Sequence, residues 1–130
     1  EIRPMYQADF AKDIKKELNI PIIAVGLITT AKQGEKLLEE KYDYIACCEV
    51  IEHFYNPKKE FELLKKLLKE DGVLYLMTGI YNDNIDFSKW WYKNDLTHVF
   101  IFQEETFEWI KKEFAFKDMK IEKNFIRLSR

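Results

Sequence analysis

Residues 42–79, YDYIACCEVIEHFYNPKKEFELLKKLLKEDGVLYLMTG, decide the fold of this chain. The run 42–48 is mostly apolar, as in a strand buried on both faces, and it stops abruptly at an acidic residue. A proline followed by apolar residues at helical spacing predicts a helix, which Asp71-Gly72 would close because glycine tolerates positive φ. Residues 73–77 form the second expected strand. A crossover of this length between two apolar strands predicts a parallel βαβ unit.

Parallel pairing would bring the polar residues that follow the two strands to one edge of the sheet. The functional groups of open α/β sheets gather at the carboxyl ends of the strands. In this sequence those ends carry Glu49, Glu52, His53 and Thr78. We therefore expect the functional site to lie above this edge.

The rest of the chain predicts a Rossmann-like α/β fold, with an open sheet of about five strands. The sheet is expected to be mostly parallel with an antiparallel last strand, to carry helices on both faces, and to form a single domain over residues 1–130. The further expected elements are a helix over 7–18, a strand over 20–25, a helix over 31–40, a helix over 104–114, and two antiparallel strands over 116–122 and 125–128.

The overall composition is that of an ordinary soluble domain, with 47% hydrophobic and 34% charged residues. A formal net charge of −2 gives no general attraction to nucleic acid or to anionic membranes. No apolar run approaches the roughly 20 residues that span a bilayer, and the amino terminus has no signal-peptide pattern. The expected location is the cytoplasm, with no membrane partner and no general nucleic-acid binding.

The opening of the chain resembles a known family. Residues 6–11 (YQADFA) and 19–29 (NIPIIAVGLIT) look like the late βα unit of the old-yellow-enzyme type of flavin oxidoreductase, which is a TIM barrel. The resemblance implies that Gly26 and Thr29 lie at a cofactor phosphate. The next strand leads into Cys47-Cys48 instead of the Gly-Arg pair that completes that site, so FMN is expected to bind weakly at best.

Four motifs follow one another along the rest of the chain: YDYI at 42–45, EVIEH at 49–53, DGVL at 71–74 and THVF at 97–100. With these motifs in the family's order, residues 42–130 resemble the carboxyl-terminal half of a class I S-adenosylmethionine-dependent methyltransferase. This resemblance implies S-adenosylmethionine as the cofactor, with Glu49 and Val50 beside it. The family's glycine-rich loop and ribose-binding carboxylate should lie upstream, where the sequence has only the lone Gly26.

The four candidate metal ligands are Glu49, Glu52, His53 and His98. Carboxylates combined with imidazole suit Mg, Mn or Zn. Glu-x-x-Glu-His followed later by His resembles the divalent-metal site of certain class I O-methyltransferases, in which the metal orients the acceptor hydroxyl and lowers its pKa. Alternatively, these side chains only line the donor pocket, with His98 and His53 as candidate catalytic residues and His98 as a general base or a packed histidine.

The two resemblances together predict a composite chain, joined near Glu40, with a flavin-barrel-like segment over 1–40 and a methyltransferase-like segment over 41–130. Without the glycine-rich loop, such a chain is expected to lack robust catalysis. Two alternatives stay open: an S-adenosylmethionine-dependent methyltransferase, with metal-assisted O-methyl transfer, and a weak FMN or phosphate binder. The acceptor would be a small molecule, and an unprotected edge strand at 20–25 would favour self-association.

The long segment 80–102 contains clustered aromatic residues, and two interpretations of it stay open. In the resembled methyltransferases, the corresponding segment covers the acceptor substrate. The alternative is an aromatic satellite core, because tryptophan and tyrosine serve both purposes.

Overall fold

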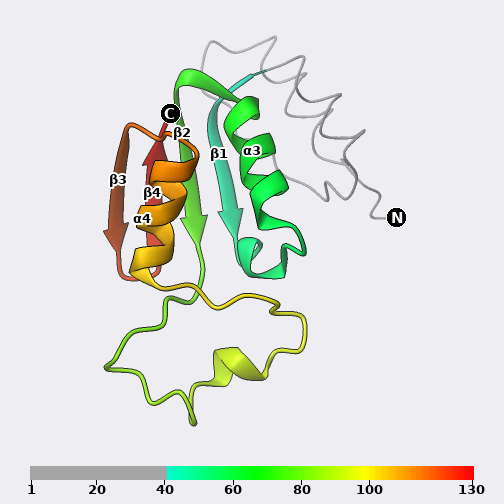
Figure 1. The fold of residues 1–130 in the computed structure, drawn as a ribbon, viewed down its shortest axis with the longest axis vertical. Helices are drawn as coiled ribbons and strands as arrows, with labels where there is room; N and C mark the ends of the chain where they lie inside the picture. Colours follow the sequence, from blue (N-terminus) through cyan, green and yellow to red (C-terminus); the bar gives the residue numbers. More distant parts are fainter. Residues whose placement is uncertain (1–40) are drawn as a thin grey trace, which may run out of the picture.

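The computed structural model describes residues 41–130, which form an open four-stranded sheet with the order β1-β2-β4-β3 (Figure 1). β1 and β2 pair in parallel, whereas β4 pairs antiparallel with both β2 and β3. This is the mixed α/β sheet with an antiparallel last strand that the sequence predicts; the strand expected over 20–25 lies outside the described residues. The strands are β1 Tyr42–Cys48, β2 Leu68–Met77, β3 Asp118–Glu122 and β4 Phe125–Ser129.

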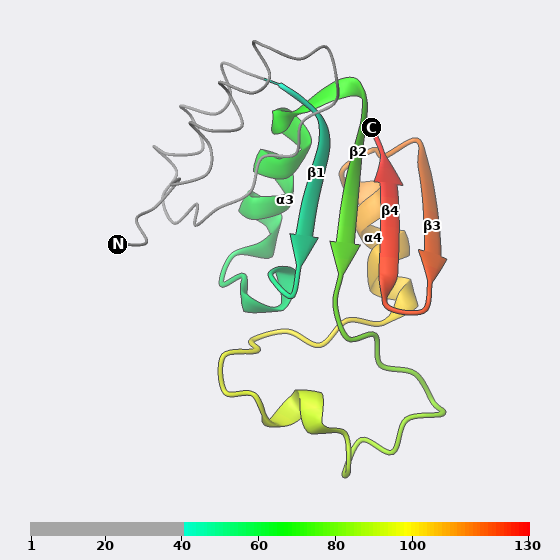
Figure 2. The same ribbon diagram turned by 180° about the vertical axis from the view of Figure 1, so that it is seen from behind.

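Two helices, α3 (Pro57–Leu67) and α4 (Glu104–Glu113), lie side by side on one face of this sheet (Figures 1 and 2). The rings of Phe61 and Phe114, from α3 and the end of α4, lie 5.6 Å apart between centroids. The helices expected over 7–18 and 31–40 lie outside the described residues, so the covering of the other face stays a prediction. None of the helices within residues 41–130 is long and apolar enough to cross a bilayer.

The hydrophobic core lies between the sheet and these two helices. Leu74 and Leu76 of β2 are fully buried, whereas Tyr75 between them is partly exposed on the opposite face. Phe61 of α3 and Phe107 of α4 bury their rings in the same cluster. This alternation along the strand fixes which residues of β2 face the helices.

Helix α3 begins where the sequence predicts and ends earlier. Pro57 occupies its first turn, and the Asn56 side chain caps it by accepting a hydrogen bond from the Lys59 backbone N–H at 3.3 Å. The helix ends at Leu67, because Leu68 is already extended and pairs with the start of β1. The prediction that Asp71-Gly72 closes the helix was therefore wrong.

Gly72 instead lies inside β2, next to an irregularity in the pairing of β1 with β2. A Cβ at this position would lie 3.0 Å from the carbonyl oxygens of Tyr42 and Lys69. Glycine is needed here for close approach of the backbone, and positive φ plays no part.

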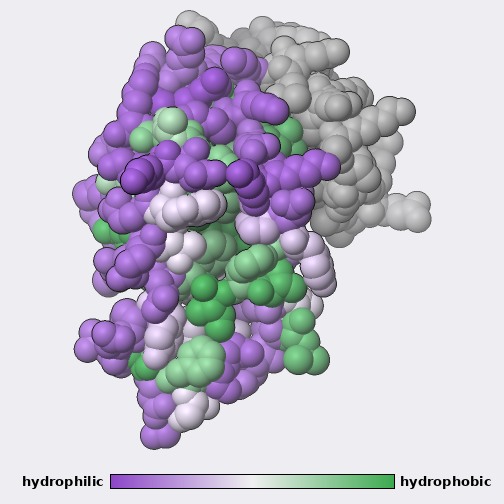
Figure 3. Space-filling model, in the orientation of Figure 1, coloured by the Kyte–Doolittle hydropathy of each residue, from purple (hydrophilic) through white to green (hydrophobic). Residues whose placement is uncertain are grey.

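Between β2 and α4, the chain forms a long loop below the carboxyl ends of β1 and β2 (Figure 1). Its two ends are tied by a parallel bridge between Ile80 and Phe102, with the Tyr81 N–H donating to the Phe102 carbonyl at 2.8 Å. The short 3-10 helix η2, Trp91–Asn94, lies within this loop. Figure 3 shows hydrophilic residues over much of the upper surface and hydrophobic residues gathered lower down, toward this loop.

The aromatic side chains of the loop pack on one another. Ring centroids of Tyr81 and Phe87 lie 5.4 Å apart, those of Tyr81 and Trp90 5.8 Å, and those of Trp90 and Tyr92 5.0 Å. These contacts form an aromatic cluster in which Tyr92 is buried and Phe87 is 45% exposed. Its covering of an acceptor stays a prediction.

Candidate functional site

The polar residues at the carboxyl edge of the sheet are positioned by a sharp turn after β1. Glu49 adopts a left-handed conformation, with φ of 50°, while its N–H donates to the Met77 carbonyl at 2.9 Å. The 3-10 helix η1, Ile51–His53, follows directly. Glu52, within η1, is fully buried.

The carboxyl group of Glu52 is fully buried, and only one of its two oxygens has a hydrogen-bond partner among the described residues. Its Oε2 accepts a hydrogen bond from the Thr78 hydroxyl at 3.1 Å. Its Oε1 has no hydrogen-bond partner among residues 41–130, and the His98 Nε2 atom lies 4.0 Å away. Burying a carboxylate oxygen without a partner is costly, so Oε1 marks a place where a cation would stabilise the site.

Both histidines direct the same ring nitrogen toward backbone carbonyls. His53 Nδ1 donates to the Thr97 carbonyl at 2.9 Å, and His98 Nδ1 donates to the Tyr92 carbonyl at 2.9 Å. Because a carbonyl only accepts, Nδ1 carries the hydrogen in both rings, and a neutral ring then keeps its lone pair on Nε2. The ligand atoms of Glu52, His53 and His98 lie within 4.8 Å of one another.

The residues that supply these carbonyls, Tyr92 and Thr97, belong to one segment, 92–100, which is hydrogen-bonded to η1. Its Val99 and Phe100 N–H groups both donate to the Glu52 backbone carbonyl, at 2.9 and 3.2 Å. Asp95 shapes the turn before His98 by accepting from the backbone N–H of Thr97 at 2.9 Å and from its hydroxyl at 2.6 Å. The Thr97 hydroxyl is the main reason that the Asp95 pKa lies below its usual value.

Of the four predicted metal ligands, the structure brings Glu52, His53 and His98 together. Glu49 is exposed at the rim and is not one of the three converging groups. Partial desolvation and the neighbouring Glu52 charge raise the pKa of Glu49. Val50, the other predicted cofactor contact of this turn, is 39% exposed beside it.

The two remaining predicted cofactor residues, Gly26 and Thr29, lie outside the described residues. Their part in holding a cofactor phosphate therefore stays a prediction. The predicted cofactor contacts that the structure does describe are Glu49 and Val50, at the turn between β1 and η1.

Two residues of the site were not assigned a role from sequence. Thr78, which directly follows β2, is fully buried, and its hydroxyl lies 2.8 Å from the Tyr92 hydroxyl. Tyr92 is 2% exposed, and desolvation raises the pKa of its hydroxyl. Thr78 could have been assigned to the site from sequence, because the polar Thr78-Gly79 pair directly follows a predicted strand. Tyr92 could not, because nothing in the sequence distinguishes it from the other aromatic residues of the loop.

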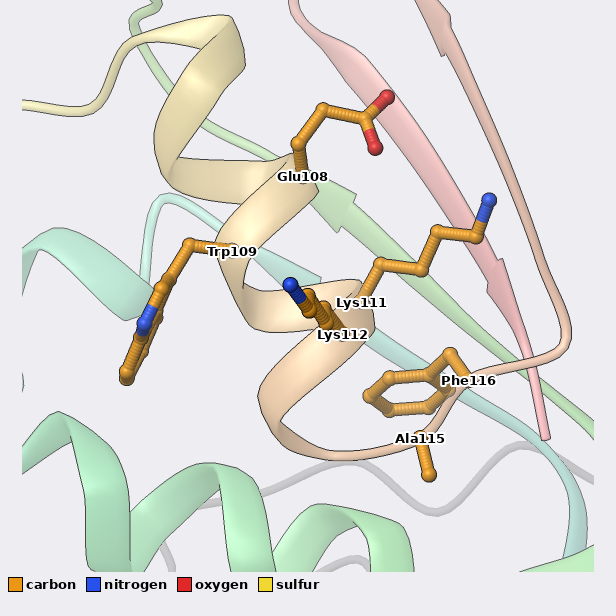
Figure 4. A pocket seen from close by; sticks show the side chains of 6 residues that line it. All are labelled: Glu108, Trp109, Lys111, Lys112, Ala115 and Phe116. Atoms are coloured by element: carbon orange, nitrogen blue, oxygen red, sulfur yellow. The ribbon is translucent and has the colours of Figure 1, made fainter.

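A hollow of about 570 Å³ lies elsewhere, around the carboxyl-terminal half of α4 (Figure 4). None of the residues that line it belongs to the cluster of Glu52, His53 and His98. We place the candidate site at the cluster because the chemically competent groups converge there. The hollow is lined by Glu108, Trp109, Lys111, Lys112, Ala115 and Phe116.

Comparison with known proteins gives a consistent picture. A family model described as a methyltransferase domain matches residues 5–121. The ubiquinone biosynthesis O-methyltransferase of Glaesserella parasuis serovar 5 is 51% identical over 39 residues, which make up 30% of this chain and 16% of that protein. The match thus spans less than a fifth of this curated relative.

Solved structures share the fold at low sequence identity. A SAM-dependent methyltransferase from Archaeoglobus fulgidus has a TM-score of 0.59 and 16% identity, covering 95% of this chain and 82% of its own. A putative O-methyltransferase from Nostoc punctiforme has a TM-score of 0.55 and 13% identity, covering 72% and 34%. The Rossmann-like α/β fold expected from sequence is confirmed by these neighbours.

The family match also bears on the expected composite origin. It begins at residue 5 and runs through the segment that was compared with a flavin barrel. None of these comparisons supports an old-yellow-enzyme origin for residues 1–40 or a junction near Glu40. They favour the methyltransferase alternative over the composite interpretation.

Proposed function

This chain belongs to the methyltransferase domain family, and from that premise we propose that it methylates a hydroxyl acceptor, with S-adenosylmethionine as donor and a divalent cation at Glu52, His53 and His98. The observation that carries the proposal is the convergence of these three ligand groups at the carboxyl edge of the sheet. The names of the similar proteins, which include O-methyltransferases, support a hydroxyl acceptor.

The residues present fit a divalent cation. The unpartnered Glu52 Oε1 supplies a charged oxygen, and the two Nε2 atoms are left as lone-pair donors by the hydrogen bonds at Nδ1. One carboxylate with two imidazoles suits Mn, Fe or Zn better than Mg, which prefers oxygen ligands. Because Glu49 is not among the three converging groups, we put Mg second to Mn and Zn. A bound cation would supply Lewis acidity, lowering the pKa of the acceptor hydroxyl.

The protein's own contribution would be positioning. Methyl transfer requires the donor methyl group in line with the acceptor oxygen, and correct placement accounts for much of the acceleration. Glu49 and Val50 follow β1 at the edge where open α/β sheets bind ligands, so we assign them to the donor side. The aromatic loop 80–102 would form the acceptor side and exclude water from the reacting atoms.

The acceptor proton needs a destination within reach of the ligand cluster. When no cation is bound, the His98 Nε2 lone pair can accept it, with the Glu52 Oε1 atom 4.0 Å away to stabilise the resulting charge. A metal-free reaction would therefore assign His98 as the general base. The metal-assisted and metal-free versions differ in one measurable property, which is the response to chelation.

The test is transfer of a labelled methyl group by the full chain. S-adenosyl-[methyl-³H]methionine would be supplied with a panel of phenols and catechols, in EDTA and in Mn²⁺, Zn²⁺ or Mg²⁺, and S-adenosylhomocysteine binding would be measured by calorimetry. We expect donor-product binding, and label transfer that requires the cation and is lost in Glu52→Gln. Absence of S-adenosylhomocysteine binding at millimolar concentration would refute the donor assignment. Transfer that is equal in EDTA and in metal would refute only the cation.

A further inference from the structure

A buried chain of hydroxyl groups leads from the aromatic loop to Glu52. The Thr78 hydroxyl donates to Glu52 Oε2 at 3.1 Å and lies 2.8 Å from the Tyr92 hydroxyl. A carboxylate only accepts, so the single hydrogen of Thr78 is used toward Glu52. Tyr92 must then be the donor to Thr78, and the hydrogen bonds run in one direction, from Tyr92 through Thr78 to Glu52.

Tyr92 also holds the opposite side of the ligand cluster. Its backbone carbonyl accepts the hydrogen of His98 Nδ1 at 2.9 Å, and its ring centroid lies 4.1 Å from that of His98. One residue thus fixes the carboxylate through its hydroxyl and the imidazole through its carbonyl and ring. Glu52 and His98 are 46 residues apart in the sequence, and Tyr92 helps to position both of them.

The ring of Tyr92 is seated on Gly79, directly after Thr78. A Cβ at Gly79 would lie 2.8 to 2.9 Å from three carbon atoms of that ring, which is closer than real contacts allow. The absence of a side chain at Gly79 therefore permits the position of the ring. The sequence Thr78-Gly79 provides both the hydroxyl and the space that Tyr92 requires.

We propose that Tyr92 and Thr78 are positioning residues that hold Glu52 Oε1 and His98 Nε2 toward one cation, an inference that rests on the proposed cation site. With Oε2 engaged by Thr78, rotation of the carboxylate is restricted, and Oε1 is the atom left for the ligand. Outer partners of this kind typically change metal affinity by about 10- to 100-fold when they are removed.

The experiment measures Mn²⁺ and Co²⁺ affinity by calorimetry and the Co²⁺ ligand-field absorption spectrum. Thr78→Val removes the hydroxyl at nearly constant shape, and Thr78→Ser restores it. Tyr92→Phe removes the second hydroxyl and leaves the ring and the carbonyl. Tyr81→Phe is the matched control, because it deletes a hydroxyl from the same aromatic cluster that makes no hydrogen bond to another described residue.

We expect Thr78→Val to weaken metal binding by about 10- to 100-fold, and Tyr92→Phe by about 10-fold, at the lower end of that range because Thr78 remains. Thr78→Ser and Tyr81→Phe should stay within about threefold of the wild type, because neither removes a hydroxyl of the chain. Gly79→Ala should weaken binding and alter the Co²⁺ spectrum without removing any hydrogen-bonding group, since it displaces the ring.

Two results would overturn the inference, and they are distinguishable. If the wild type binds metal while Thr78→Val and Tyr92→Phe bind it equally well with an unchanged spectrum, the positioning role fails and the cation site stands. If the wild type binds metal no more tightly than Glu52→Gln, the cation site and the positioning role fail together. The assignment of S-adenosylmethionine as donor is tested separately by S-adenosylhomocysteine binding, and neither result affects it.

Discussion

Replacing Glu52 by glutamine should have opposite effects on stability in the absence and in the presence of metal. Glu52 is fully buried, with one carboxylate oxygen unpartnered among the described residues. An unsatisfied buried polar group costs about 1–3 kcal/mol, and a charged one more. Glutamine is neutral and of similar size, and its carbonyl oxygen can still accept from Thr78. We therefore expect Glu52→Gln to raise the free energy of unfolding by about 1–3 kcal/mol in EDTA.

In saturating metal, the wild type should instead be more stable than Glu52→Gln. A ligand at 1,000 times its dissociation constant stabilises the folded state by about 4.1 kcal/mol, and the variant would gain little because it lacks the charged ligand. The expected gain of the variant in EDTA is therefore exceeded in metal. Thermal unfolding followed by circular dichroism would show it, at roughly 4 °C per kcal/mol for a chain of this size.

The test depends on whether Glu52→Gln raises or lowers the free energy of unfolding in EDTA. The wild type and the variant should be compared at equal protein concentration, with and without saturating Mn²⁺, and Thr78→Val serves as a control for loss of the hydrogen bond alone. A variant that is less stable than the wild type in EDTA would mean that the buried carboxylate is already compensated without metal. The interpretation of Oε1 as a place for a cation would then be refuted.

Three further predictions concern other parts of the chain. Lys65→Met should lower the free energy of unfolding by about 1–2 kcal/mol in urea titrations, because the ammonium donates to the carbonyl oxygens of Phe114 and Ala115, at 2.7 and 2.5 Å, at the end of α4; an unchanged midpoint would contradict this. Gly72→Ala should cost about 1–3 kcal/mol through the 3.0 Å contacts of its Cβ with backbone oxygens, and a variant as stable as the wild type would show that β2 can shift. The raised pKa of Glu49 means that the folded state binds its proton more readily than the unfolded state, so the contribution of this group to stability falls as pH rises above about 4.5. Glu49→Gln should flatten the dependence of the melting temperature on pH in that range, and an equally steep profile would count against the assignment.

The secondary structure was largely predictable where local signals and tertiary pairing agree. The first residue of α3 follows from Pro57 and its Asn56 cap, and the turn between β3 and β4 falls at Lys123-Asn124, where Lys123 adopts a φ of 55°. The end of α3 was not predictable from spacing. The residues after Leu67 continue a helical pattern, but Leu68 pairs with Tyr42, and this long-range pairing overrides local propensity.

The site was predictable in its side chains and not in its backbone. Glu52, His53 and His98 stand out by residue type and order, so their convergence could be expected from a resemblance. The carbonyls of Tyr92 and Thr97, which orient the histidine rings, have no sequence signature because every residue carries one. Glu49 looked equivalent to Glu52 in sequence, and the structure distinguishes them by burial, because Glu52 is fully buried whereas Glu49 is exposed.

The two N–H groups of Val99 and Phe100 that share the Glu52 carbonyl have a mechanical consequence. These hydrogen bonds join segment 92–100 to η1, the short helix that contains Glu52 and His53. Moving segment 92–100 away from η1 would break both hydrogen bonds, so we expect this part of the loop to resist displacement. If the proposed function holds, an acceptor would therefore enter through another part of the loop.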